Sequence, residues 1–257
     1  MNATASVTSP AGGLARDRPP SLQRLARVEL RKMTDTRSGF WLLLATLALA
    51  VTVAIVSAVA GHQRDHTFHQ VLSSTLQALD VLLPIVGILL VTSEFSQRTT
   101  LITFVLVPQR LRVLVAKLLA GILLALVAWA AALALSALGT LIDPASSGAW
   151  TLSVGLLAQT ILFAMLSMLL GMALGAALVI PAAAIVASFA LPIGFAALTS
   201  IHGLHPLSRW LSQSDNLNHL TDHALDGGEW AHLATTTLLW LAVPLAIGVY
   251  RLRQDVS

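Results

Sequence analysis

The chain has 257 residues, of which 56% are hydrophobic and only 11% are charged. About a quarter of the residues in a soluble domain are charged, so this composition excludes an ordinary soluble domain. Apolar runs of about 20 residues recur without the alternation typical of membrane β-strands, which predicts an all-α polytopic membrane protein. The chain has no cysteine, which excludes disulfides and thiolate metal sites.

Residues 1–20 are rich in Ala, Ser, Thr, Gly and Pro and lack periodicity, which predicts a disordered tail rather than a signal peptide. Residues 21–37 predict an amphipathic helix that lies at the membrane interface. Its expected apolar face holds Leu22, Leu25, Ala26, Leu30 and Met33, and its expected polar side and end hold Arg24, Arg27, Arg31 and Lys32.

Glu29 falls within the apolar face of this helix, where a charge is costly unless it has a partner. Two explanations remain open for it. The carboxylate either reaches out to water, or it makes a polar contact with another subunit.

Six membrane spans are predicted, at residues 40–60, 71–92, 114–141, 152–174, 184–201 and 231–250. We expect a short reversal over residues 175–183 at Pro181, and a fifth span broken by Pro192 and Gly194. Residues 202–230 form the longest polar segment between spans, with room for short helices.

Ser167, Gly171 and Gly175 recur at four-residue spacing in the fourth predicted span. Small residues at this spacing allow two membrane helices to approach closely, which predicts a packing seam. Chance spacing in a segment rich in Gly and Ala is the alternative.

The basic residues indicate how the chain is oriented. If the N-terminus is cytoplasmic, all but Arg64 and Arg209 of the 15 Lys and Arg residues fall on the cytoplasmic side. Six spans return the C-terminus to the same side, where Arg251 and Arg253 follow the last span. We therefore expect both termini in the cytoplasm.

Several catalytic motifs are absent from the sequence. It contains no G-x-x-x-x-G-K-[ST] phosphate loop, no H-E-x-x-H and no G-x-S-x-G. Asp80 is the only ionisable residue well inside a predicted span. We therefore expect no catalysis on this chain and little basis for a proton relay.

The histidines fall in segments predicted to lie outside the cell. His219 and His223 have the i, i+4 spacing of a metal pair on a helix, with acidic residues nearby. They are weak candidates for a metal site or an external pH sensor. Ordinary polar loop composition is the alternative, and we predict no metal site.

Residues 94–113, between the second and third predicted spans, combine charged residues with an apolar stretch too short to cross a membrane. Together with the basic amphipathic helix and the six spans, they resemble the membrane subunits of type-2 ATP-binding-cassette (ABC) exporters, the ABC-2 permease family. The resemblance covers residues 24–253, including Glu94, Phe95, Arg98, Thr99, Thr100, Leu101, Pro108, Arg110 and Lys117. The family usually has a Gly-Thr pair where this chain has Thr99 and Thr100.

The resemblance implies a six-helix transmembrane domain over residues 21–253 and a pair of permease subunits, identical or different. It also implies that residues 94–113 form a coupling segment that contacts a cytosolic ATPase, with help from the amphipathic helix. ATP and magnesium would then bind to that partner, and this chain would need no cofactor. Glu94 could pair with Arg98 or with the ATPase, or the two residues could simply cap a helix end.

The function expected from this resemblance is export across the plasma membrane. Because the spans carry few charges, an amphiphilic or hydrophobic substrate is expected, such as a drug, a peptide antibiotic or a lipid. The alternative is an ATP-independent carrier, or a membrane anchor or scaffold protein.

Overall fold

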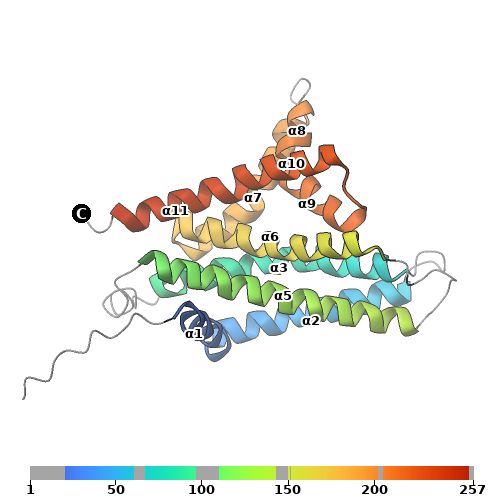
Figure 1. Ribbon diagram of the computed structural model, residues 1–257, viewed down its shortest axis with the longest axis horizontal. Helices are drawn as coiled ribbons and strands as arrows, with labels where there is room; N and C mark the ends of the chain where they lie inside the picture. The colour runs from blue at the N-terminus through green and yellow to red at the C-terminus, as the bar shows by residue number, and fades with distance from the viewer. Residues whose placement is uncertain are drawn as a thin grey trace, which may run out of the picture.

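The computed structural model describes residues 21–60, 67–96, 110–142, 150, 152–201 and 205–254. These residues form helices and no strand (Figure 1). The elements are α1 (Leu22–Asp35), α2 (Arg37–Ala60), α3 (Phe68–Ser96), α5 (Arg110–Ile142), α6 (Val154–Leu178), α7 (Pro181–Thr199), α8 (His205–Leu211), α9 (Gln213–Asp222), α10 (Gly227–Thr237), the π-helical turn η1 (Leu238–Ala242) and α11 (Val243–Gln254). The predicted tail, residues 1–20, lies outside the described part.

Six helical stretches among the described residues are long and apolar enough to cross a membrane, which confirms the predicted number of spans. They are α2, α3, α5, α6, α7 and the continuous run from α10 through η1 into α11. The observed helices extend beyond the predicted spans at several ends, because polar residues at a span end can continue a helix without lying in hydrocarbon.

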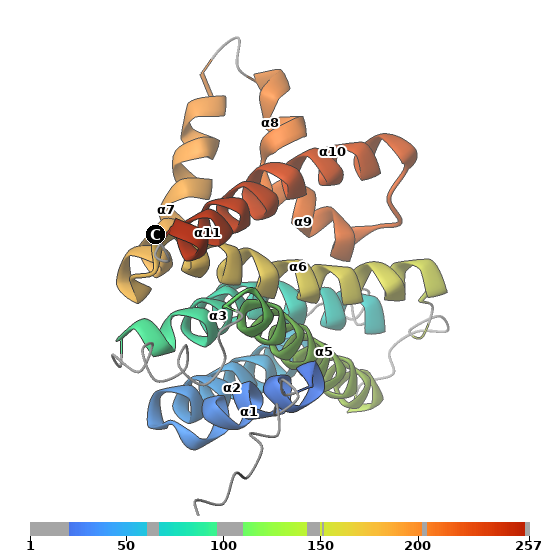
Figure 2. The same cartoon turned by 60° about the vertical axis from the view of Figure 1, so that its left-hand side comes forward.

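The centre of the bundle is the contact between α3 and α6. Both views place α6 between a group made of α1, α2, α3 and α5 and a second group made of α7 to α11 (Figures 1 and 2). Leu72, Leu76 and Leu83 of α3 and Phe163 and Met168 of α6 are fully buried. In contrast, α7 and the last helical run expose most of their apolar side chains.

The small residues of α6 lie against α3. A methyl group added at Gly171 would overlap the backbone of Pro84, and one added at Gly175 would lie 3.2 Å from the Cα atom of Ile88. Ser167, one helical turn before Gly171, is fully buried. The backbones of α3 and α6 can therefore approach this closely only because α6 has glycine or serine at the contact.

The reversal between α6 and α7 is tighter than the sequence indicated. Gly175 lies inside α6, and the turn itself consists only of Val179 and Ile180, with Pro181 as the first residue of α7. Val179 adopts a left-handed conformation with φ of 64°, and its N–H donates to the Gly175 carbonyl. A β-branched residue is strained in this conformation, so packing on both sides must maintain the turn.

The fifth span is not broken at Pro192, contrary to the expectation from sequence. Residues Pro181 to Thr199 form one helix that runs through Pro192 and Gly194. Proline removes one hydrogen bond from a helix, and membrane helices often tolerate this loss. The presence of Pro192 and Gly194 was therefore not enough to predict a break.

The last span responds to its proline differently. Immediately before Pro244, residues Leu238–Ala242 widen into a π-helical turn, in which the N–H of Val243 donates to the Leu238 carbonyl five residues earlier. Pro244 has no N–H to donate to Trp240, so a wider turn at this point absorbs the missing bond without ending the helix.

The polar segment before the last span contains α8, α9 and the start of α10. Leu217 and Leu220 of α9 are buried in the core, so α9 is part of the packed bundle and does not lie free on its surface. The indole N–H of Trp240 donates to the Leu211 carbonyl at 2.8 Å and joins the end of α8 to the last span.

Candidate functional site

The amphipathic helix α1 begins at a well-formed cap. The Ser21 hydroxyl accepts a hydrogen bond from the backbone N–H of Arg24 at 3.3 Å, which satisfies one of the free donors at a helix start. The helix ends at Asp35, and α2 starts directly after the capping residue Thr36. Gly39 makes this corner possible, because a methyl group at its Cα would overlap the carbonyl of Met33.

Helix α1 has one side buried against the bundle and one exposed side. Ala26, Glu29 and Met33 are buried, whereas Arg24 and Arg27 are exposed. Arg31 is also exposed and pairs with Asp35 at 3.2 Å. The helix therefore packs against the bundle along one side and presents a row of guanidinium groups on the other.

The buried carboxylate of Glu29 lies at the centre of a cluster formed by α1, α3 and α5. Lys117 of α5 donates to Glu29 Oε2 at 2.6 Å and to the Leu90 carbonyl of α3 at 3.0 Å. Lys32, one turn along α1, donates to Glu29 Oε1 at 2.7 Å. We call Glu29, Lys32, Lys117 and the Leu90 carbonyl the Glu29 cluster.

The Glu29 cluster keeps its charge in spite of burial. The side chains of Glu29 and Lys117 are only 6% and 5% exposed. Burial by itself raises the pKa of Glu29, but the charges and hydrogen bonds of Lys117 and Lys32 outweigh it, so the pKa lies below its ordinary value. Breaking such a buried pair costs far more than breaking an exposed one, because a charge is left without compensation.

The Glu29 cluster corrects the sequence interpretation in one respect. The explanation that Glu29 reaches out to water is wrong, because the residue is 5% exposed. The polar contacts that the structure gives it are to Lys32 and Lys117 of the same chain. The signal in the sequence was a carboxylate, Glu29, on the expected apolar face of a helix and a lysine, Lys117, among apolar residues.

Lys117, which the sequence assigned to the coupling segment, is therefore a buried link between helices. Other residues of that assignment lie nearby along the chain, with Glu94 and Phe95 in the last turn of α3 and Arg110 at the first position of α5. The predicted segment 94–113 thus starts and ends within helices. Arg98, Thr99, Thr100, Leu101 and Pro108 lie outside the described residues.

The same end of the bundle gathers other basic groups. Figure 1 shows α1, the start of α5 and the end of α11 at one end, which we call the basic end. There the Arg251 guanidinium donates to the Ala177 carbonyl at 2.6 Å and joins α11 to the last turn of α6. A cation at a helix C-terminus satisfies free carbonyls and is favoured by the helix dipole.

The two candidate metal ligands lie away from the basic end, on and just after α9. The rings of His219 and His223 have centroids 5.4 Å apart, and His223 Nε2 lies 2.8 Å from Glu229 Oε1. Glu229 also completes a capping box with Asp226 at the start of α10. Among the residues that the structure describes, no group of three His, Asp or Glu side chains has the arrangement of a metal site.

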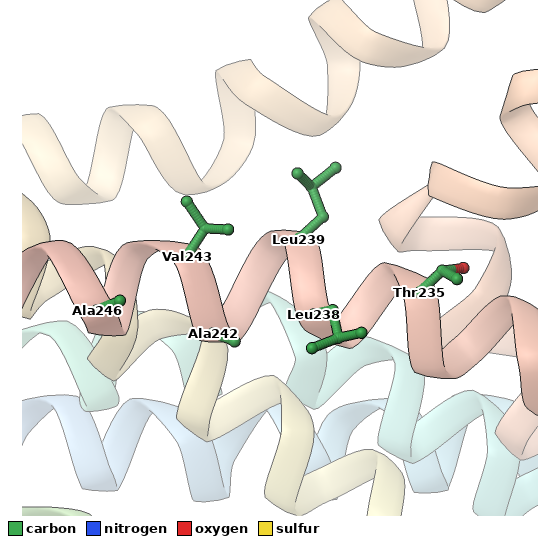
Figure 3. Close-up of a pocket in the computed structure, with 6 residues that line it drawn as sticks. All are labelled: Thr235, Leu238, Leu239, Ala242, Val243 and Ala246. Atoms are coloured by element: carbon green, nitrogen blue, oxygen red, sulfur yellow. The ribbon is translucent and has the colours of Figure 1, made fainter.

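An apolar groove, which the sequence analysis did not predict, follows the π-helical turn of the last span. It has a volume of about 470 Å³ and is lined by Thr235, Leu238, Leu239, Ala242, Val243 and Ala246. Leu239 and Val243 point to the same side of the helix (Figure 3). With one hydroxyl among six side chains, the groove offers van der Waals contact and little that would orient a polar ligand.

Comparisons with known proteins identify no relative of this chain. No protein-family model matches the sequence. No curated protein matches it closely enough to count as a relative. Function must therefore be argued from the residues and their arrangement.

Proposed function

We propose that this chain is the membrane subunit of an ABC exporter of the ABC-2 type. It lies in the plasma membrane, with both termini in the cytoplasm. It pairs with a second permease subunit and couples to a separate cytosolic ATPase, which binds ATP and magnesium. The exported substrate is amphiphilic or hydrophobic, and this chain performs no catalysis itself.

The observation that carries the proposal is the buried ion pair between Glu29 and Lys117. It joins α1, which exposes a basic face, to the first turns of α5, which follow the proposed coupling segment along the chain. The hydrogen bond from Lys117 to Leu90 adds α3, which precedes that segment. A force applied to α1 or to the coupling segment would therefore reach the same three helices through one rigid contact.

The exposed basic face of α1 suits contact with a protein at the membrane surface. Arg24 and Arg27 project away from the bundle, and guanidinium groups form directional hydrogen bonds with carboxylates. The basic end also agrees with a cytoplasmic location, since cytoplasmic segments are enriched in Lys and Arg. In the proposed complex this face lies against the ATPase.

A second candidate is an ATP-independent carrier or membrane scaffold. One observation favours a carrier, namely the buried Oδ1 atom of Asp80 near the middle of α3. Carriers use ionisable groups at this depth, but they usually place them in networks or on broken helices. Apart from Asp80, ionisable residues within the described spans lie toward the span ends.

The proposal can be tested by purifying the tagged chain from its native membrane in mild detergent. We expect a cytosolic ATPase subunit to co-purify, and the double variant Arg24→Glu/Arg27→Glu to reduce its recovery several-fold. Arg209→Glu, at an exposed position of α8 far from the basic end, is the matched control and should leave recovery unchanged. If the wild-type chain recovers no ATPase subunit, the exporter proposal fails.

Transport measurements separate the two candidates. In inside-out membrane vesicles that contain the complex, accumulation of a fluorescent amphiphilic substrate should require ATP and stop with a non-hydrolysable analogue. Accumulation driven by an ion gradient without ATP would favour the carrier instead.

A further inference from the structure

Asp80 of α3 is an acidic residue with a buried carboxyl oxygen, and it takes no part in the Glu29 cluster. It lies near the midpoint of the span Phe68–Ser93, at the depth where a charge is most costly. Its Oδ1 atom is buried and forms no hydrogen bond with any residue that the structure describes. The buried carboxylate of Glu29 is bonded to a lysine, Lys117. The Oδ1 atom of Asp80 has no such bond among the described residues, and this difference needs a physical explanation.

No cation faces Asp80 from the helices packed against α3. Helices α6 and α7 contain no charged residue or histidine. The charged residue of α2 is Arg37, its first residue, and those of α5 are Arg110, Arg112 and Lys117, all near its start. Helix α9 contributes Asp215, His219 and Asp222, of which Asp222 is bonded to Gln77.

The hydroxyl of Ser167 on α6 is a hydrogen-bonding neighbour of the Asp80 carboxyl group. That hydroxyl already donates its hydrogen to the Phe163 carbonyl at 2.9 Å. A serine hydroxyl has one hydrogen to donate and two lone pairs to accept with. If that hydrogen stays on the Phe163 carbonyl, Ser167 can only accept from Asp80, and a carboxyl group can donate only when it carries a proton.

The proline four residues after Asp80 leaves a backbone carbonyl without its usual helical donor. Pro84 lies inside α3 and has no N–H, so the carbonyl of Asp80, four residues earlier, lacks its donor within the helix. An ionised Asp80 would add a negative charge beside this free carbonyl. Among the described residues, the surroundings of Asp80 therefore offer acceptors and no compensating positive charge.

We propose that Asp80 is a proton-binding site in the middle of the membrane. Its carboxyl group carries a proton and donates it to Ser167 Oγ, which in turn donates to the Phe163 carbonyl. This hydrogen-bonded chain bridges α3 and α6 one turn away from the contact of Gly171 with Pro84. Release of the proton would leave a carboxylate that needs the Ser167 hydrogen, so the bond to Phe163 would be given up.

A polar route connects this site with the surface near α9. Gln77 lies one helical turn from Asp80 on α3 and donates to Thr221 Oγ1 at 3.2 Å and to Asp222 Oδ1 at 3.0 Å. Asp222 is exposed. Polar side chains therefore extend from the exposed surface of α9 to within one helical turn of Asp80.

Infrared spectroscopy of the purified chain in lipid nanodiscs at neutral pH tests the proposal. The wild-type spectrum minus that of Asp80→Asn should contain the carbonyl band of a protonated carboxylic acid. Asp215→Asn, which removes a water-exposed carboxyl group of α9, is the matched control and should leave that band in place. If Asp80→Asn removes only the bands of an ionised carboxylate, the proposal is wrong.

A second variant keeps the proposal testable if Asp80→Asn does not fold. Ser167→Ala removes the acceptor but keeps the small side chain that the contact with α3 needs. The carboxylic acid band should then move to higher frequency, because its hydrogen bond is lost. A folded Ser167→Ala protein whose band does not move would overturn the bridge between Asp80 and Ser167.

Discussion

At the scale of single residues, Glu29 and Asp80 show two ways of placing an acidic group inside an apolar bundle. Glu29 keeps its negative charge because Lys117 and Lys32 approach within hydrogen-bonding distance. Asp80 has no such partner among the described helices, and we propose that it keeps a proton instead. The difference follows from position, since Glu29 lies at the basic end and Asp80 near mid-span.

Removing Lys117 tests the Glu29 cluster. Lys117→Met should lower the free energy of unfolding by about 3 kcal/mol, because a buried carboxylate loses its main partner while Lys32 remains. The double variant Glu29→Leu/Lys117→Met should recover to within about 1 kcal/mol of wild type, because no buried charge is left unpaired. Thermal and denaturant unfolding in detergent provide the measurement.

Arg31→Met is the matched control for this prediction. It breaks the exposed ion pair with Asp35, which solvent screens, and should have little measurable effect. A double variant no more stable than Lys117→Met alone would show that Lys117 acts through its packing or its bond to Leu90 rather than through the charge of Glu29.

At the scale of elements, the contact of α3 with α6 organises the bundle. Two helices approach closely at Gly171 and Pro84, and the flanking leucine, phenylalanine and methionine side chains are buried around this point. Without the small residues, the same apolar side chains would hold the helices farther apart and lose contact. The packing of α3 against α6 therefore depends on small residues at a few positions of α6, such as Gly171.

Gly171→Ala should destabilise this contact. The added methyl group overlaps the Pro84 backbone, and such overpacking costs about 1–3 kcal/mol in the free energy of unfolding. Gly155→Ala on the same helix is the matched control, because a methyl group there meets no atom within 4 Å. It should be neutral or slightly stabilising, by up to about 1 kcal/mol. Equal melting temperatures for the two variants would contradict the close approach of α3 and α6.

At the scale of the whole molecule, the two ends of the bundle differ in chemistry. The basic end gathers the arginines of α1, Lys117 and Arg251, whereas α9 and the residues after it carry several histidines and acidic residues. Such asymmetry is expected of a membrane protein with one orientation. In the proposed exporter the basic end faces the cytoplasmic ATPase.

Cysteine labelling tests this orientation, and the chain suits the method because it contains no cysteine. Gln23→Cys on α1 and Ser214→Cys on α9 occupy exposed positions at opposite ends. A membrane-impermeant maleimide should label Ser214→Cys in intact cells and Gln23→Cys only after the membrane is opened. The wild-type chain should remain unlabelled, and the reverse pattern of labelling would show that the orientation is inverted.

The sequence alone was sufficient for features that depend on local chain properties. The length of an apolar run needs no knowledge of distant residues, so six helices long and apolar enough to span a membrane could be predicted. The family resemblance and the ATPase partner also came from sequence and remain proposals. The continuity of α7 through Pro192 was missed, because a proline signal in sequence does not reveal how neighbouring helices support it.

Only the tertiary structure decided which distant residues meet. Glu29 and Lys117 are 88 positions apart, and nothing in their local sequences selects one as the partner of the other. Likewise, the Asp80–Ser167 contact depends on how α3 and α6 pack, which is set by the small residues at their interface. Hydrophobic length determines that a helix enters the membrane, but the pairing of buried polar groups follows from the close packing of the whole bundle.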